Sequence, residues 1–259
     1  MKKFLFSILM LGILSPLTAA KITKKVCETQ KGTFIFAGGE CIEYAAIEGE
    51  RKNALTVIVH GTWKAGTDIL ARYTPFAETI NLTTDITTVA VALPGYSRSS
   101  TNHLHALSHK GTEKPFATRA YVQFLDQLIQ ALKKRYHADT VNYIGHSAGA
   151  SMGATLTGYH PGLISHIALA GGRYRARGAE HAKGLIFVDD YMDRLDKKTQ
   201  YLLIYGSKDT ISRPRISKDF YALAKKADLD VTLVEVEDAR HLDLDMTDTS
   251  VEAIEKMLE

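Results

Sequence analysis

Residues Gly145–Gly149 have the sequence Gly-His-Ser-Ala-Gly and separate two segments of different periodicity. Before them, Thr140–Ile144 is a short run typical of a buried strand. After them, Ala148–Tyr159 is rich in small residues and typical of a helix that packs close to a sheet. A Gly-x-Ser-x-Gly sequence between a strand and a helix forms a sharp, strained turn that exposes the serine hydroxyl at the carboxyl edge of a sheet. The sequence therefore predicts a strand–turn–helix unit with Ser147 at its tip.

The rest of the chain alternates between apolar runs and amphipathic segments, as expected of an α/β fold whose central sheet is mostly parallel with helices on both faces. A short antiparallel hairpin is expected first, with strands Thr33–Ala37 and Cys41–Ile47 joined by two glycines. No repeat or long linker divides the chain, so we expect a single domain over residues 21–259. Further strands are expected over Leu55–Val59, Ile86–Leu93, Ile164–Leu169, Tyr201–Tyr205 and Val231–Val236, and further helices over Asp68–Ile80, Arg119–Tyr136, Pro214–Lys226 and Ser250–Leu258.

Two further polar residues follow predicted strands. Asp209 comes after the strand that ends at Tyr205, and His241 comes after the next strand. Because the carboxyl ends of parallel strands meet at one edge of a sheet, Ser147, Asp209 and His241 should converge. Serine is a poor nucleophile at neutral pH and needs an adjacent base, which is the role that a histidine oriented by an aspartate can fill. An isolated histidine or aspartate is more often a surface residue, but three such residues after three strands favour a catalytic site.

From about residue 55 to its end, the chain resembles the α/β-hydrolase superfamily, in which nucleophile, acid and base follow one another in this order. The resemblance implies Ser147 as nucleophile, Asp209 as acid and His241 as base. It also implies that the backbone N–H groups of Thr62 and Ala148 form the oxyanion hole. No metal and no organic cofactor are expected to take part.

The turn Leu93–Ser99 resembles the Pro-Gly-x-Gly-x-Ser turn of the same superfamily, but Ser97 stands where the second glycine is usual, so its shape is in question. Trp63, beside the expected oxyanion hole, and Tyr96, in this turn, are candidates to line the substrate pocket. Core packing explains Trp63 equally well. The span from Gly172 to Thr199 has room for a helix and two loops but not for a large cap domain, which predicts an open pocket.

Two polar clusters admit both a functional and a structural interpretation. The arginines of Arg173–Arg177 follow a predicted strand, where they could attract an acidic group of the substrate or belong to a solvated loop. The histidines of His103–His109 could bind a metal, but no carboxylate lies near them until Glu113. A surface loop is the favoured interpretation of both clusters.

The first twenty residues have the pattern of a secretory signal peptide. Lys2 and Lys3 precede an apolar run of 11 residues, Phe4–Leu14, and small residues lead to a cleavage point after Ala20. The apolar run is about half of the roughly 20 residues that span a bilayer, which favours cleavage over an uncleaved anchor. We therefore expect a secreted or periplasmic protein without stable membrane association.

Cys27 and Cys41 are the only cysteines and lie just after this leader. In an oxidising compartment, a disulfide between them is expected. The chain has 32 basic and 29 acidic side chains, so loss of Lys2 and Lys3 leaves a net charge of about +1. That balance gives no electrostatic case for a nucleic-acid partner.

These features together predict a hydrolase that cleaves small-molecule carboxylic esters through an acyl-enzyme on Ser147. A serine peptidase or amidase similar to the prolyl oligopeptidase group would use the same residues, but that group usually carries a large propeller, for which this chain has no room. An acyltransferase would use them while excluding water. A non-catalytic binding protein on the same fold would not need all three. The sequence indicates neither the acyl chain, the alcohol nor the oligomeric state.

Overall fold

The computed structural model describes residues 20–64, 66–109 and 114–259. The predicted signal peptide, except for Ala20, lies outside the described residues. Among the described residues, no helix is long and apolar enough to cross a membrane.

The described residues form an eight-stranded sheet with the strand order β1-β2-β4-β3-β5-β6-β7-β8. The pairs β1–β2 and β2–β4 are antiparallel, and all pairs from β4 to β8 are parallel. The predicted hairpin and the mostly parallel sheet are therefore confirmed. The strands are β1 (Phe34–Ala37), β2 (Glu40–Ile47), β3 (Arg51–Val59), β4 (Ile86–Val91), β5 (Thr140–His146), β6 (His166–Ala170), β7 (Gln200–Gly206) and β8 (Asp230–Val236).

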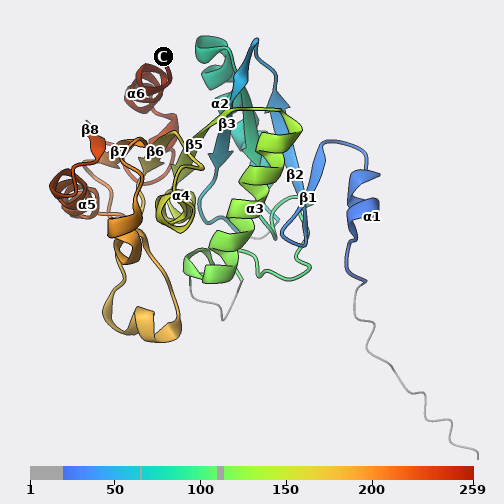
Figure 1. Ribbon diagram of the computed structural model, residues 1–259, viewed down its shortest axis with the longest axis horizontal. Coiled ribbons are helices and arrows are strands. Elements are labelled where there is room, and N and C mark those ends of the chain that lie inside the picture. Colours follow the sequence, from blue (N-terminus) through green and yellow to red (C-terminus); the bar gives the residue numbers. More distant parts are fainter. Residues whose placement is uncertain (1–19, 65, 110–113) are drawn as a thin grey trace, which may run out of the picture.

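Helices cover both faces of this sheet, with α2 and α6 on one side and α3, α4 and α5 on the other (Figure 1). Thr118 caps α3 by accepting a hydrogen bond from the Tyr121 N–H, and Asp68 caps α2 in the same way. The α-helices are α1 (Lys24–Glu28), α2 (Ile69–Thr84), α3 (Arg119–Arg135), α4 (Ala148–Tyr159), α5 (Pro214–Lys226) and α6 (Asp248–Leu258), and the 3₁₀ helices are η1 (Pro115–Ala117), η2 (Gly178–Lys183), η3 (Val188–Arg194) and η4 (Leu244–Met246).

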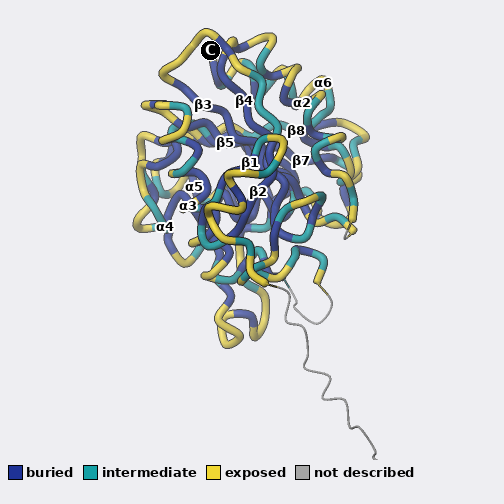
Figure 2. Tube along the Cα trace, turned by 90° about the vertical axis from the view of Figure 1, so that its right-hand side faces the viewer, coloured by how far each residue is buried: buried dark blue, intermediate teal, exposed yellow. Residues whose placement is uncertain are grey.

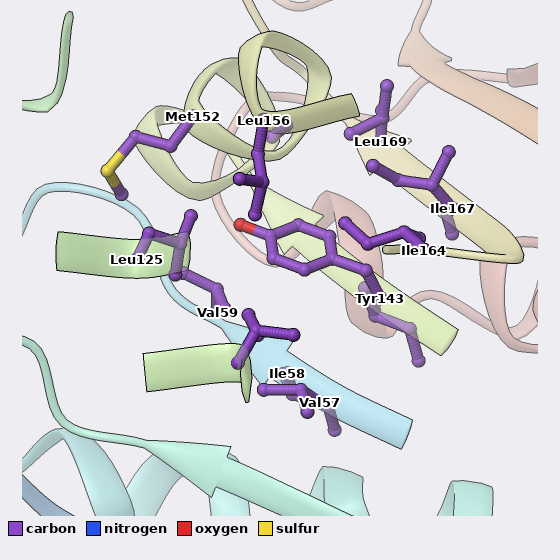
Figure 3. Close-up of a cluster of buried hydrophobic side chains, with 14 of the residues drawn as sticks. Val57, Ile58, Val59, Leu125, Tyr143, Met152, Leu156, Ile164, Ile167 and Leu169 are labelled. Atoms are coloured by element: carbon purple, nitrogen blue, oxygen red, sulfur yellow. The ribbon is translucent and has the colours of Figure 1, made fainter. Parts of the chain in front are cut away.

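The core lies between the sheet and its helices, so the central strands are mostly buried, while exposed residues are concentrated in the outer helix faces, the loops and the edge strand β8 (Figure 2). Tyr143 on β5 is fully buried among aliphatic side chains of β3, α3, α4 and β6 (Figure 3). Its hydroxyl donates a hydrogen bond to the Gly149 carbonyl oxygen, 2.7 Å away. A Cβ on Gly153 would lie 2.3 Å from the Tyr143 ring. The small residues of α4 therefore make room for a large ring directly beneath the strand–helix turn.

Two segments differ from the sequence expectations. Residues Gly172–Thr199 contain the two short 3₁₀ helices η2 and η3, where one helix with two loops was expected. The short helix α1 was not predicted, although its N-cap Thr23 is a typical helix-start residue.

The predicted disulfide between Cys27 and Cys41 is present and ties α1 to β2. Both cysteines are fully buried, and they form a small cluster with Phe34 at the outer end of the sheet. The bond therefore attaches the segment before the hairpin to the sheet itself.

Candidate active site

Ser147 lies at the junction of β5 and α4 with φ 53° and ψ −110°, a conformation that non-glycine residues rarely adopt. Its backbone N–H donates to the Ala170 carbonyl oxygen on the neighbouring strand β6, at 2.8 Å. The residue is half-buried, so solvent reaches it. A strained residue held this way between a strand and a helix is the geometry in which a serine hydroxyl projects from the sheet edge.

Two glycines permit the close approaches that this turn requires. A Cβ on Gly149 would lie 2.1 Å from the Val59 carbonyl oxygen at the end of β3. A Cβ on Gly61 would lie 2.8 Å from the Cβ of Ser147. Both neighbours are fixed by the backbone, so only glycine fits at either position. The loop after β3 consequently runs directly beside the serine.

His241 connects the serine to the predicted acid. Its Nε2 lies 2.8 Å from Ser147 Oγ, and its Nδ1 lies 2.7 Å from Asp209 Oδ2. An Nδ1–H that donates to the carboxylate leaves Nε2 free to accept the serine hydroxyl proton. The structure therefore brings the three residues together in the arrangement that the sequence predicts.

Asp209 is buried, and its second carboxylate oxygen is held by the backbone. Oδ1 accepts hydrogen bonds from the N–H groups of Ile211 and Ser212, both at 2.8 Å. These bonds aim Oδ2 at His241 and compensate a buried negative charge. Three other carboxylates are engaged elsewhere: Asp189 pairs with Arg175, Asp190 accepts from the Phe187 N–H, and Asp243 pairs with Arg72.

His146 also contacts His241, and the sequence analysis missed this contact. Its Nε2–H donates to the backbone carbonyl oxygen of His241 at 2.8 Å, and the two rings lie 5.0 Å apart. The side chain of His146, directly before Ser147, thus holds the backbone of His241, whose ring contacts Ser147. The only sequence signal for this role was its place in the pentapeptide.

The two expected oxyanion donors flank Ser147. Ala148 begins α4, where the first N–H groups of a helix have no intrahelical acceptor and carry the positive end of the helix dipole. Thr62 is exposed and follows Gly61, which lies against Ser147. Both N–H groups therefore belong to segments that adjoin the serine.

His60 and Tyr96 fix the loop that carries Thr62. His60 Nδ1–H donates to the Gly61 carbonyl oxygen at 2.6 Å, and its Nε2 accepts the Leu93 N–H at 3.0 Å. Burial lowers the pKa of His60 to about 4, only partly offset by the bond to Gly61, so the ring is neutral and keeps one donor and one acceptor.

Tyr96 occupies a different place from the one expected. It is fully buried, and its hydroxyl accepts the Trp63 N–H at 2.7 Å and donates to the Trp63 carbonyl oxygen at 2.5 Å. A fully buried ring does not line an open pocket, so the expectation for Tyr96 is corrected: it anchors the loop backbone. Trp63 is half-buried, packs on the core and has the Arg72 guanidinium 4.7 Å from its ring centroid. The core-packing interpretation of Trp63 therefore holds for at least part of its surface.

The arginines after β6 are mostly engaged within the protein. Arg173 pairs with Glu180 and stacks on Phe187, with 4.4 Å between guanidinium and ring centroid. Burial alone would raise the pKa of Glu180, but Lys114, the backbone and Arg173 together lower it to about 2. Arg175 pairs with Asp189, as noted above, so Arg177 is the exposed arginine of this segment that forms no ion pair with the described residues. This segment serves first to hold the loop between β6 and β7 in place.

The histidines of His103–His109, for which a surface loop was the favoured interpretation, do not gather into one site. His103 contacts Lys21 Nζ at 2.9 Å, whereas His105 stacks on His109 at 4.4 Å between ring centroids. Within the part of the chain that the structure describes, no three His, Cys, Asp or Glu side chains come close enough to hold a metal ion.

No protein-family profile matches the chain, and no curated protein matches it in sequence. Its structure is similar to the esterase Pf2001 of Pyrococcus furiosus, with a TM-score of 0.67 and 17% identity over 91% of this chain and 93% of that one. It is similar to the meta-cleavage product hydrolase of Pseudomonas fluorescens IP01 (TM-score 0.63, 12% identity, 87% and 97% coverage). It is also similar to the Bacillus cereus carboxylesterase (TM-score 0.60, 17% identity, 84% and 93% coverage). These similarities establish the α/β-hydrolase fold, as the sequence resemblance implied.

Proposed function

We propose that this protein is a serine hydrolase that cleaves carboxylic esters of small molecules in a secreted or periplasmic location. The observation that carries the proposal is the position of His241, within hydrogen-bond distance of both Ser147 Oγ and Asp209 Oδ2. The esterase names of two structurally similar proteins support an ester substrate. The buried disulfide is in keeping with an oxidising compartment.

The reaction follows from the geometry. Ser147 Oγ attacks the ester carbonyl carbon while His241 Nε2 takes its proton, and the buried Asp209 carboxylate stabilises the resulting imidazolium. The oxyanion binds to the N–H groups of Thr62 and Ala148, each worth about 3 kcal/mol in the transition state. Collapse of the intermediate expels the alcohol, which takes the proton from His241 and leaves an acyl group on Ser147. Water then attacks the acyl-enzyme while His241 takes its proton. His241 returns that proton to Ser147 Oγ as the carboxylic acid is released.

An open site fits short or medium acyl groups. Only the short helices η2 and η3 lie between β6 and β7, and Ser147 is partly exposed to solvent. An aqueous route to the acyl-enzyme favours hydrolysis over acyl transfer, because transfer requires that water be excluded.

The test is a screen of the purified residue 21–259 protein against p-nitrophenyl esters of increasing acyl length and the matching p-nitroanilides. We expect ester turnover that is highest for short or medium chains, with slower anilide cleavage, and no turnover by Ser147→Ala. Faster cleavage of anilides would indicate an amidase or peptidase. Rates that rise steeply with long chains at a lipid interface would contradict the open pocket. No turnover of any substrate, with no labelling of Ser147, would contradict the function itself.

A further inference from the structure

The loops of the proposed oxyanion donor and base come from distant strands. Thr62 follows β3, whereas His241 follows β8, and β5, β6 and β7 lie between these two strands in the sheet. The hydrogen bonds of the sheet therefore do not fix the two loops directly to each other. Both must nevertheless keep their positions relative to Ser147 to within a fraction of an ångström, because a displacement of about 1 Å can cost a hundredfold in rate.

Arg72, in the first turn of α2, contacts both loops. Its guanidinium carbon lies 4.7 Å from the ring centroid of Trp63, the residue after Thr62. The same guanidinium forms an ion pair with Asp243, two residues after His241. The side chains are 30% and 46% exposed, and an ion pair this accessible to solvent contributes little stability by itself. Its significance is that one rigid, planar group bridges the two loops.

A buried polar layer lies beside this bridge. Tyr73 and Asp245 are 2% and 1% exposed, and the Asp245 charge helps burial to raise the pKa of Tyr73, while Arg72 opposes it. Several polar atoms here are buried without a well-formed hydrogen bond in the described structure: the Trp63 indole N–H, Arg72 Nε, the Tyr73 hydroxyl, Asp243 Oδ1 and both Asp245 oxygens. Arg72 is the cation whose charge acts on Tyr73 in this layer. Arg72 thus pairs with Asp243 at the edge of this buried layer and acts on Tyr73 within it.

We propose that Arg72 is a positioning residue, which clamps Trp63 of the oxyanion loop to Asp243 of the His241 loop and so keeps Thr62 N–H and His241 in register with Ser147. This role rests on the proposed function. It does not place Arg72 in contact with the substrate. Loss of the clamp lowers the rate of the chemical steps more than it weakens substrate binding.

The experiment compares Arg72→Gln and Arg72→Lys with the wild-type protein, using a p-nitrophenyl ester that the wild type hydrolyses. For Arg72→Gln we expect a 10- to 100-fold lower kcat with KM changed less than about threefold, consistent with the cost of a small misplacement. Arg72→Lys keeps the charge but not the planar stacking, and should be intermediate. Trp63 is the only tryptophan, so its fluorescence reports on the clamp directly, and its emission should shift in both variants.

Arg175→Gln is the matched control, because it breaks another Arg–Asp pair on a different loop. It should leave kcat and the fluorescence unchanged. Asp243→Asn removes the charge of the other partner in the same ion pair, and it serves as the test variant if Arg72→Gln fails to fold. The kcat of the double variant should be no lower than that of the slower single variant, since both substitutions remove the same contact.

A kcat within twofold of wild type in Arg72→Gln, or in Asp243→Asn where Arg72→Gln does not fold, would overturn the inference. An equal loss in Arg175→Gln would overturn it as well. If the wild type neither turns over esters nor reacts with a fluorophosphonate, the proposed function fails instead. The two failures are therefore distinguishable.

Discussion

His241 Nδ1 lies 2.7 Å from Asp209 Oδ2, although the two residues belong to separate loops after the neighbouring strands β7 and β8. Because these strands are parallel, both loops leave the sheet at the same edge. The other carboxylate oxygen of Asp209, Oδ1, accepts hydrogen bonds from two backbone N–H groups. The carboxylate that contacts the histidine ring is therefore itself held by the backbone.

Asp209→Asn tests this relationship. The substitution keeps the shape but removes the charge and favours the wrong histidine tautomer, so we expect a loss of about ten-thousand-fold in kcat with little effect on folding. Asp189→Asn and Asp190→Asn are the controls and should cost far less, because neither carboxylate contacts His241. Ester kinetics on the three variants decide the assignment. If Asp209 is dispensable and one of the controls is not, the acid is misassigned.

Gly149→Ala tests the packing of the turn. The added Cβ would lie 2.1 Å from the Val59 carbonyl oxygen, and a strand backbone cannot yield. We expect at least a hundredfold loss of activity and about 1–3 kcal/mol of destabilisation, measured by urea unfolding. Gly178→Ala is the comparison, since nothing lies within 4 Å of its Cβ position and only its φ of +56° is unfavourable. Wild-type activity in Gly149→Ala would show that the turn differs from the structure.

The buried His60 makes stability depend on pH. Its pKa is about 4 in the folded state and 6.5 when unperturbed, so between these values the unfolded chain binds the proton that the folded protein refuses. The stability that depends on the neutral His60 ring is therefore fully present above pH 6.5 and is lost as the pH falls toward 4. From pH 7 to pH 5, the wild type should lose about 2 kcal/mol more unfolding free energy than His60→Gln. Parallel losses in the two proteins would contradict a buried neutral ring.

The disulfide gives a prediction about stability alone. Cys27 and Cys41 are 14 positions apart, and closing a loop of that length stabilises a fold by about 3 kcal/mol in the chain-entropy description. Mild reduction, or a double Cys→Ser variant, should lower the free energy of unfolding by that amount. Ester turnover should persist, because the cysteines lie at the outer end of the sheet. Unchanged stability would mean that α1 contributes nothing to the fold.

Much of the fold could be predicted because its signals are local. Central strands buried on both faces leave continuous apolar runs, as in β3, and the boundaries of α4 and α5 follow from the residues that begin and end them. The spatial meeting of Ser147, Asp209 and His241 was also predictable, because each follows a parallel strand. The topology of the sheet, more than any contact between side chains, brings them together.

The contacts that support these three residues could not be predicted, because they join side chains that lie far apart in the sequence. Arg72 meets Asp243 only because α2 and the turn before α6 pack on one face of the sheet, and no local pattern encodes that contact. Tyr96, in the turn Leu93–Ser99, was expected to line the substrate pocket. Its hydroxyl instead points into the protein and holds the Trp63 backbone. Sequence spacing predicted that Ser147, Asp209 and His241 would meet, but not which residues hold them.

The central claim is that Ser147 is a nucleophile activated by His241. Intact-mass measurement after treatment with a fluorophosphonate tests it most directly, on wild type and Ser147→Ala in parallel. The wild type should gain the mass of one phosphonyl group, mapped by peptide analysis to Ser147, and Ser147→Ala should gain none while remaining folded. An unlabelled wild type, or a Ser147→Ala variant labelled as fast as wild type, would contradict the account.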